Sequence, residues 1–476
     1  CGRVPGGPGA AAWRRVRGRV IAPARRAAFD ALGAIARGRS DLDTGIEAAR
    51  RLVSDARDVA LVRELVTGTL RWQGAIDGVI APLCRVALTK LDVEVLTTLR
   101  LGAYQLLYLD RVPASAVVDD AVGLVRAARK SSATGLVNAV LRRIARGERG
   151  APAVDADDVD TLARVASHPA WLVRRWLGRR PRSEVDAWLA FNNAPAPLTL
   201  RVNPLVAGSR AEVAEALARY GVVTAPCRYA PLGLVVQDGN PLGTPPMQAG
   251  ACSLQDEGSQ LAALVAPVYA GARVLDVCAS PGGKTLAYLA AAGGGGYVVA
   301  ADVRTRRVQL LAETLTRARA ARAGIVHIDA DGALPVRAAF DVVAVDAPCS
   351  GLGTLRRDPD IKWRRTPDDL PRLAARQLDL LQRASATVSA GGLLVYTTCS
   401  SEADENEDVV ARFLELTPAF TLGRADRGPH AALLAPFCDA QGRFATDPAR
   451  HGLQSYFGVV LTREGVGPAL AAVVQW

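Results

Sequence analysis

The chain has 476 residues, of which half are hydrophobic and 22% are charged, a composition typical of folded globular proteins rather than disordered ones. Its formal net charge of +11 favours an anionic partner. The eight cysteines form no Cys-x-x-Cys pair and the four histidines are isolated, so we expect reduced thiols in a cytoplasmic protein without a metal site. No uncharged stretch predicts a membrane span.

Basic residues dominate the start of the chain. Residues 1–20 mix Arg with Gly and Pro, and we expect a disordered basic arm there. Because the chain begins at Cys1 without an initiator Met or a signal-peptide core, a truncated N-terminus is also expected.

Residues 21–148 are predicted to be entirely helical. Leu, Val and Ala recur there at three- and four-residue spacing, with short breakers such as Arg111-Val-Pro113 between the segments. The pattern leaves two roles open for this bundle, a packing or dimerisation module and an RNA-binding module. A Gly-, Pro- and Asp-rich linker follows at 147–160.

A small α/β domain is predicted for residues 161–250. It begins with an amphipathic helix at 168–176, and a Pro-rich segment then leads into a strand at 198–202. A helix near 209–220 completes the pattern.

Strands and helices alternate over residues 251–476. Strands are predicted at 273–277, 297–302, 324–328, 340–346 and 392–398, with a further β segment near 455–462. Helices are predicted between them, including 304–321 and 370–388. Such alternation predicts a Rossmann-like α/β domain with a largely parallel sheet.

The first strand of this domain runs into a glycine-rich turn, Val274-Leu-Asp-Val-Cys-Ala-Ser-Pro-Gly-Gly-Lys-Thr285. A phosphate-binding loop would need Gly where Cys278 stands, and the dinucleotide pattern Gly-x-Gly-x-x-Gly is absent. The turn therefore predicts close approach to some other ligand, at the carboxyl end of a strand.

Acidic residues end the next two strands. Asp302 lies 19 residues after Gly283, close to the spacing at which an acid binds ribose hydroxyls in nucleoside-binding folds. Asp331 ends the third strand. Together with Asp276, these acids favour a nucleoside that carries positive charge and disfavour a polyphosphate, so S-adenosylmethionine fits better than ATP or NAD.

Two cysteines follow buried strands in the same manner. Asp346-Ala-Pro-Cys349 ends one strand and Thr397-Thr-Cys399 ends another, and a Ser follows each cysteine. A lone cysteine in such a place usually fills space in a core, but two of them suit one particular chemistry. A thiolate that adds to carbon 6 of cytosine makes carbon 5 nucleophilic towards a methyl donor, and a second group must then help to release the product.

The chain resembles the RsmB/Sun family of RNA (cytosine-5)-methyltransferases, which carry a NusB-like N-terminal domain. The catalytic resemblance rests on five stretches: Gln255-Asp-Glu-Gly-Ser-Gln260, Asp276–Thr285, Asp346-Ala-Pro-Cys-Ser-Gly351, Arg357-Asp-Pro-Asp-Ile-Lys-Trp363 and Tyr396-Thr-Thr-Cys-Ser400. The helical region resembles the NusB-like domain through Leu65–Trp72, Leu99–Leu107 and Val137–Arg143.

The resemblance implies a role for each motif residue. Cys399 would be the nucleophile, Cys349 would assist product release, and Asp346 would hold the cytosine ring. DNA cytosine-5 methylation uses the Pro-Cys cysteine as nucleophile instead, so the two cysteine roles remain exchangeable. The implied S-adenosylmethionine-binding residues are Cys278, Ala279, Ser280, Pro281, Gly282, Gly283, Lys284, Asp302, Arg307, Asp331 and Asp346.

Within that site the resemblance assigns the methionine part of the donor to residues 279–284, the ribose to Asp302 and the adenine end to Asp331, with Asp329 as a substitute. Lys362 falls in a motif beside the active site. Gln454-Ser-Tyr-Phe457 departs from the family pattern, which puts C-terminal substrate contacts in question.

The predicted protein is thus a monomeric cytoplasmic enzyme that methylates RNA, with small-subunit ribosomal RNA as the expected substrate and tRNA as the alternative. The target base must be unstacked to reach the site. Two other classes of protein are possible alternatives. One is a non-catalytic RNA-binding assembly factor, which the two intact cysteines disfavour, and the other is a phosphate-loop NTPase, which Cys278 disfavours.

Overall fold

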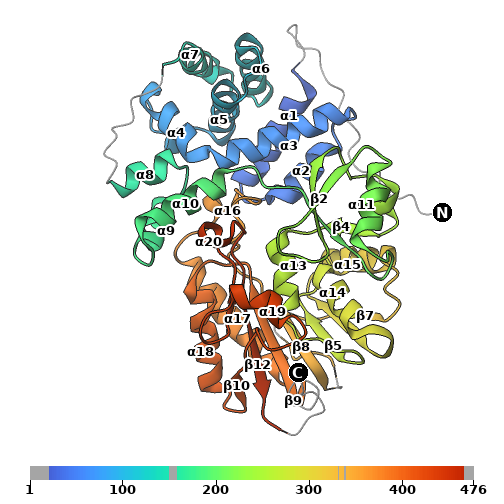
Figure 1. The fold of residues 1–476 in the computed structure, drawn as a ribbon. Coiled ribbons are helices and arrows are strands. Elements are labelled where there is room, and N and C mark those ends of the chain that lie inside the picture. Colours follow the sequence, from blue (N-terminus) through green and yellow to red (C-terminus); the bar gives the residue numbers. More distant parts are fainter. Residues whose placement is uncertain (1–20, 149–157, 331, 337–338, 466–476) are drawn as a thin grey trace, which may run out of the picture. The chain divides into compact units, whose positions relative to one another are not determined.

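The computed structural model describes residues 21–148, 158–330, 332–336 and 339–465 (Figure 1). The predicted arm at 1–20 lies outside the described residues.

The chain divides into two compact units, 1–173 and 174–476, which are described separately. The finer domain boundaries predicted at 148, 161 and 250 stay predictions. No helix in the described part is long and apolar enough to cross a membrane.

The described residues of the first unit form helices joined by short loops and contain no strand, as predicted. Its α-helices are α1 (Pro23–Ala36), α2 (Leu42–Arg50), α3 (Ala56–Arg71), α4 (Gln73–Ile80), α5 (Val93–Tyr108), α6 (Ala114–Ala127), α7 (Thr134–Ala145) and α8 (Val159–Val165). Helix α9 (Ala170–Leu177) spans the junction with the second unit.

Helix α5 is the central helix of this bundle. It contacts α1, α3, α4, α6 and α7 (Figure 1). Gly102 lets α5 approach α7 closely, because a Cβ at this position would lie 2.7 Å from Cδ1 of Leu141. The helix starts follow from the sequence as well: Asp41 and Asp55 accept backbone N–H bonds as the N-caps of α2 and α3.

A four-stranded antiparallel sheet opens the second unit. Its order is β2-β3-β1-β4. The bounds in this region are α10 (Arg182–Asn193), β1 (Thr199–Val202), α11 (Arg210–Ala218), β2 (Val223–Pro226), β3 (Gly233–Asp238), α12 (Pro245–Gln248) and β4 (Cys252–Leu254). Helix α11 packs on this sheet through Val213 and Leu217, so the predicted strand and helix of the small α/β region are confirmed.

The rest of the second unit is built on a larger sheet. Its strands are β5 (Arg273–Val277), β6 (Tyr297–Asp302), β7 (Ala323–His327), β8 (Phe340–Asp346), β9 (Val388–Thr398), β10 (Phe420–Leu422), β11 (Phe444–Ala445) and β12 (Phe457–Arg463). The helices among them are α13 (Glu257–Leu264), α14 (Gly283–Ala292), α15 (Thr305–Arg317), α16 (Ile361–Arg364), α17 (Asp369–Ser385), α18 (Glu407–Leu416), α19 (Ala431–Leu434) and α20 (Pro448–His451).

The strand order is β10-β12-β9-β8-β5-β6-β7, and β11 pairs with β12. Strands β5 to β9 are parallel to one another, whereas β12 runs antiparallel to β9. From β5 the chain first builds outwards through β6 and β7, then returns to the other side of β5 for β8 and β9. Ligands of doubly wound sheets bind at such a reversal, here the carboxyl ends of β5 and β8.

Alternate strand residues supply the two cores of this sheet. On one face Val274, Val342 and Val395 pack with residues of α13, α14 and α15. On the other face Leu275 and Val343 pack with residues of α17 and α18. Helices on both faces of a parallel sheet confirm the predicted Rossmann-like class.

Candidate active site

The register of the sheet brings the motif residues to one edge. Val277 of β5 pairs with Val345 of β8, and Asp346 of β8 pairs with Thr397 of β9. The segments that follow these three strands therefore begin side by side, although they are 50 residues or more apart in the sequence.

The loop between β5 and α14 has a backbone that few residues could adopt. Cys278 has a φ of +66°, and Gly282, the N-cap of α14, has a φ of +106°. A Cβ on Gly282 would lie 3.0 Å from Leu311. The loop also contains the cis peptide Ser280–Pro281. Gly282 and Gly283 place no side chain at the start of α14, as binding of a ligand against a loop backbone requires.

Asp302 fastens this loop to the neighbouring strand. The Asp302 carboxylate accepts hydrogen bonds from the backbone N–H groups of Ser280 (3.1 Å) and Val303 (2.8 Å), and it is buried. The Ala279 N–H donates to the Ala301 carbonyl (2.9 Å). Asp302 therefore shapes the loop in addition to any contact it makes with a ribose.

Asp276 lies beneath the loop and does not face solvent. Its Oδ2 accepts a 2.6 Å hydrogen bond from the Thr285 hydroxyl, whereas its buried Oδ1 has no hydrogen-bond partner among the described residues. Burial raises the pKa of Asp276 to about 7, against the opposing effect of the Thr285 bond.

Lys284 extends to the carboxylate that ends β8. Its Nζ donates to Oδ2 of Asp346 at 2.6 Å, and the Thr397 hydroxyl donates to Oδ1 at 3.0 Å. Lys284 is only 8% exposed. A buried lysine bound to an aspartate is not placed to hold phosphates, and Thr285 is bound to Asp276, so the geometry excludes the phosphate-loop alternative.

The two cysteines meet at this edge. The Sγ atoms of Cys349 and Cys399 are 3.0 Å apart, and the Cys399 N–H donates to Sγ of Cys349 at 3.3 Å. Both are free thiols. The pKa of Cys349 is raised well above its usual value, first by its hydrogen bond to Cys399 and then by burial. Cys349 is therefore a thiol that keeps its proton, and either sulfur can be the donor in the contact between the two cysteines.

Sequence reasoning missed Glu405, which lies in the short 3₁₀ turn after β9. Its buried carboxylate accepts hydrogen bonds from the hydroxyls of Ser350 and Ser400, the residues that follow the two cysteines. The repeated Cys-Ser pair was the available signal, because two buried hydroxyls need an acceptor.

Arg201 was also missed. This residue of β1 is 6% exposed, and its Nη1 donates to the Gly283 carbonyl at 2.5 Å. Burial lowers its pKa to about 10. An arginine between Leu200 and Val202 in a short strand was the signal that the sequence offered.

The other predicted site residues are more dispersed. Arg307 is exposed on α15, yet near enough to act electrostatically on Cys278. Asp331 lies outside the described residues, whereas Asp329 is exposed beyond β7. Lys362 is buried, and its Nζ donates to Oδ1 of Asn193 at the end of α10 (2.8 Å).

The segment that departs from the family pattern is part of the scaffold. Gln454 donates to Asp256 (2.7 Å), and the Ser455 N–H donates to the Gly353 carbonyl (2.9 Å) in the loop after Cys349. Residues 454–456 are buried. Through the bond from Ser455 to Gly353, this segment supports the loop that follows Cys349.

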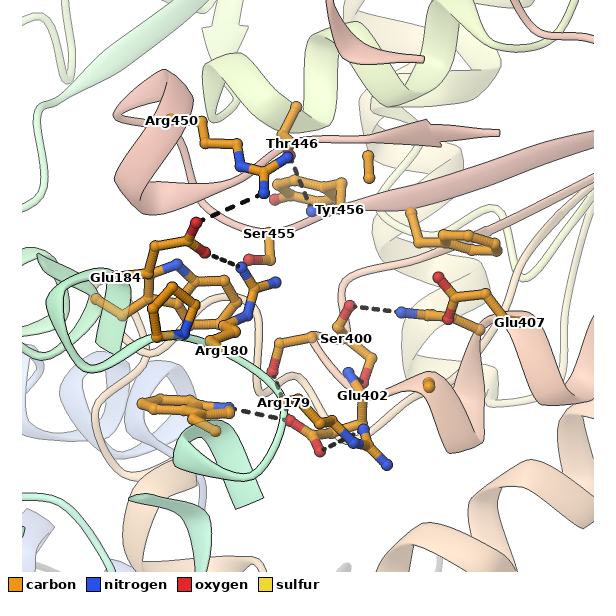
Figure 2. Close-up of a pocket in the computed structure, with 18 residues that line it drawn as sticks. Arg179, Arg180, Glu184, Ser400, Glu402, Glu407, Thr446, Arg450, Ser455 and Tyr456 are labelled. Atoms are coloured by element: carbon orange, nitrogen blue, oxygen red, sulfur yellow. Dashed lines mark hydrogen bonds and ion pairs between the residues drawn. The ribbon is translucent and has the colours of Figure 1, made fainter. Parts of the chain in front are cut away.

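A cavity of about 370 Å³ is lined in part by Ser400 and Ser401 (Figure 2). Its charged side chains largely neutralise each other: Arg179 is 3.6 Å from Glu402, and Arg180 and Arg450 both contact Glu184. None of the predicted catalytic or donor-binding residues lines it. Asp346, Cys349 and Cys399 lie instead at the carboxyl ends of β8 and β9.

Comparison with known proteins gives consistent matches along the chain. Residues 262–431 match the model described as 16S rRNA methyltransferase RsmB/F, residues 22–146 match the NusB family, and residues 168–242 match the RsmF/B-like ferredoxin-like domain.

Curated relatives match over most of their length. Ribosomal RNA small subunit methyltransferase B of Pseudomonas putida is 37% identical, covering 83% of this chain and 89% of that protein. The protein of the same name from Pseudomonas syringae is 35% identical, covering 83% and 87%. The crystal structure of PH0851 superposes with a TM-score of 0.80 at 25% identity, covering 94% of this chain and 100% of that one.

The sheet, its glycine turn and these matches define an S-adenosylmethionine-dependent methyltransferase. More narrowly, the chain belongs to the RsmB/F family of RNA methyltransferases, with a NusB-type helical domain and a ferredoxin-like domain ahead of the catalytic one. The resemblance seen in the sequence is confirmed.

The residues present fit this cofactor. The donor is a cation at its sulfonium centre, and the carboxylates of Asp276, Asp302 and Asp346 surround the turn that precedes α14. Oδ1 of Asp276 has no hydrogen-bond partner among the described residues. Within the described residues no group of three or more potential metal ligands gathers.

Proposed function

We propose that this protein methylates carbon 5 of a cytidine in small-subunit ribosomal RNA through a covalent bond between Cys399 and the cytosine. The observation that carries the proposal is the 3.0 Å approach of the Cys349 and Cys399 sulfurs beside Asp346 and the donor loop. Two adjacent thiols have no use in methyl transfer to an exocyclic nitrogen or a ribose oxygen, whereas transfer to carbon 5 needs both a nucleophile and a proton acceptor.

In the first step the Cys399 thiolate forms a bond to carbon 6, and the electron pair of the 5,6 double bond becomes available at carbon 5. S-adenosylmethionine, when bound, would supply the methyl group as an electrophile: its S–CH₃ bond would break, and the electron pair would stay on the sulfur of S-adenosylhomocysteine. Carbon 5 would take the methyl group. Removal of the carbon-5 proton re-forms the double bond and expels the Cys399 thiolate. The ring thereby gains a methyl group and loses one proton, and Cys399 is regenerated.

The hydrogen bond between the cysteines supports this division of roles. While Cys399 is free, its sulfur is the largest cause of the raised pKa of Cys349. Once Cys399 is bonded to carbon 6 that cause disappears and the pKa of Cys349 falls, so Cys349 can release its own proton to solvent. The Cys349 thiolate formed in this way can then accept the carbon-5 proton. Cys349 is thus a neutral thiol before the addition and a base after it.

Asp346 is suited to hold the base. Its carboxylate can accept a hydrogen bond from the cytosine amino group, and Lys284 and Thr397 already fix its orientation. For the donor we assign the backbone of residues 278–283 to the methionine part and Asp302 to the ribose. Lys284, Arg307 and Asp331 remain predicted donor residues, Lys284 acting through Asp346.

The RNA class is assigned from the relatives and the composition. The relatives are named as small-subunit ribosomal RNA methyltransferases, and a net charge of +11 suits an RNA ligand. We propose that the NusB-type domain contributes RNA contacts, and that the enzyme acts as a monomer in the cytoplasm, where ribosomal RNA is available.

The cysteine roles can be tested with purified protein and a transcript that contains the target. Cys399→Ala should abolish methyl transfer, whereas Cys349→Ala should accumulate a denaturation-resistant RNA–protein adduct, because addition proceeds but proton removal does not. Gel shift under denaturing conditions and transfer of labelled methyl groups are the readouts, with Cys438→Ala as the matched thiol control.

Adduct accumulation with Cys399→Ala instead would reverse the assignment. Methyl transfer by a variant that carries both Cys349→Ala and Cys399→Ala would contradict the covalent mechanism. Failure of the intact protein to transfer methyl groups to any RNA would favour a non-catalytic assembly factor. Bisulfite mapping of cellular RNA with and without the protein identifies the modified nucleotide and separates ribosomal RNA from tRNA.

A further inference from the structure

The loops that carry the two cysteines share a single buried acceptor. Oε2 of Glu405 accepts from the Ser350 hydroxyl and from the Ser400 hydroxyl, each at 2.5 Å. Oε1 accepts from the Ser350 N–H at 2.8 Å and from Nε2 of Gln377 at 2.9 Å. Four donors therefore converge on one carboxylate, which matches its capacity when it is ionised.

Glu405 is itself held in place by hydrogen bonds from Tyr396 and Gln377. The Tyr396 hydroxyl donates to its backbone carbonyl at 2.6 Å, and Gln377 also donates to the Pro348 carbonyl, next to Cys349. The side chain is fully buried, and no Lys or Arg of the described residues forms an ion pair with it. A buried carboxylate that has hydrogen bonds but no cationic partner is costly to fold, so its presence between two reactive loops calls for a functional reason.

We propose that Glu405 is a positioning residue that clamps the two cysteine loops together, so that the sulfurs of Cys349 and Cys399 stay at reacting distance throughout the covalent cycle. This inference rests on the proposed cysteine mechanism. Ser350 and Ser400 each adjoin one cysteine, so the shared oxygen fixes the relative position of the loops. The other contacts that join the two loops here are the sulfur–sulfur contact, the Cys399 N–H bond to Sγ of Cys349, the contact of the Ser350 and Ser400 hydroxyls (3.2 Å) and the Gly353 N–H bond to the Cys399 carbonyl (3.0 Å). Of these groups, the Glu405 carboxylate is the one that accepts from both serines at once.

The clamp also affects the proton on Cys349. The titratable and charged groups that face this thiol are Cys399, Glu405, Tyr396 and, through the Cys349 carbonyl, Arg365. The Glu405 charge is one of the causes that raise the pKa of Cys349. Loss of that charge lowers the pKa, so the proton is lost at lower pH.

Glu405→Gln is the direct test, because it preserves shape. The glutamine amide has one acceptor oxygen where the carboxylate has two. Its NH₂ group would therefore face some of the donors that now bind Glu405, and those hydrogen bonds would be lost. Under single-turnover conditions we expect the methylation rate to fall by about 10²-fold, as small misplacements of reacting groups do, with the KM for S-adenosylmethionine nearly unchanged. The alkaline limb of the pH–rate profile should move to lower pH, a shift that loss of stability alone would not produce.

Ser350→Ala and Ser400→Ala provide a second route that removes no charge. Each should slow methylation, and the double variant should be little slower than the worse single one, because either change opens the clamp. Neither should move the pH profile as Glu405→Gln does. Independent, fully additive effects of the two serines would contradict a shared clamp.

Glu402→Gln is the matched control. Glu402 is also buried (1% exposed) and lies three residues away, but its side chain accepts from Arg175, Trp176 and the Ser401 hydroxyl and not from Ser350 or Ser400. Its methylation rate should stay within a few-fold of the parent, and the melting temperatures of both variants separate loss of fold from loss of positioning.

Cys349→Ala separates this inference from the function itself. If Cys349→Ala forms no adduct, the proposed mechanism has failed. If it forms the adduct, but Glu405→Gln methylates at the parent rate with the parent pH profile, the mechanism stands and the clamp is wrong. If the mechanism and the clamp both hold, adding Glu405→Gln to Cys349→Ala should slow adduct formation.

Discussion

At the scale of single residues, the site depends on groups whose charge is set by burial. Cys349, Asp276 and Cys278 all have a raised pKa, and for the latter two burial is the first cause. The pKa of Cys278 is raised to about 12, so this thiol stays neutral beside the donor loop and does not compete as a nucleophile. Cys278 and Cys349 are therefore both neutral thiols.

Asp276 makes the stability of the donor loop depend on pH. Its pKa is about 7 in the folded protein and 3.8 as the reference value. Because the pKa of Asp276 is higher in the folded protein, protonated Asp276 adds to the free energy of unfolding. This contribution is fully present below about pH 4 and is lost as the pH rises through 7, with a magnitude on the order of 4 kcal/mol. Asp276→Asn should remove this dependence.

The measurement is the melting temperature of the cofactor-free protein at pH 5 and pH 8. The parent should lose more stability across this interval than Asp276→Asn does. Asp186→Asn, at an exposed ion pair with Arg182, is the control and should follow the parent. Parallel pH dependences in all three proteins would show that Asp276 does not titrate in this range.

At the scale of elements, strand register assembles the site. Parallel strands end at a common edge, so β5, β8 and β9 deliver the donor loop, Asp346 and Cys399 together. The small sheet contributes through β1, because Arg201 reaches the carbonyl of Gly283 at the start of α14. The ferredoxin-like domain therefore supports the donor loop directly.

Arg201→Ala should weaken donor binding without removing a donor contact. A hydrogen bond from a charged group contributes about 1.5–3 kcal/mol, so we expect the Kd for S-adenosylmethionine to rise by about tenfold or more. Isothermal titration calorimetry measures this, with the exposed Arg219→Ala on the same small domain as control. An unchanged Kd would mean that the loop holds its shape without β1.

At the scale of the whole molecule, the net charge of +11 is the feature most directly tied to an RNA ligand. In the helical unit, Arg126 and Arg129 are exposed near the end of α6 and form no ion pair with any described residue. Nearby basic residues are already paired: Lys130 with Asp92, and Arg143 with Glu148.

Replacing Arg126 and Arg129 together with Gln should weaken RNA binding and reduce its salt dependence. Each phosphate contact contributes about 0.7–0.9 to the slope of log K against log salt, so the slope should fall in magnitude by about 1 to 2. Fluorescence anisotropy across a salt series measures it, with the exposed, paired Arg412→Gln as control. An unchanged slope would favour the packing interpretation of the bundle.

The sequence by itself determined the local features of this protein. Helical periodicity, the strands from 273 to 398 and the glycine turn at 282–283 all depend on neighbouring residues, and the structure has them where they were predicted. The resemblance also identified both cysteines, since its motifs are short and contiguous.

Only the tertiary structure decided how these pieces act on one another. The 3.0 Å approach of the two sulfurs, the hydrogen bond of Lys284 to Asp346 and the clamp at Glu405 join residues that are up to 62 positions apart. Such contacts depend on strand register, loop conformation and side-chain direction, which no local pattern encodes. Burial, which raises the pKa of Asp276 and contributes to that of Cys349, exists only after the chain has folded.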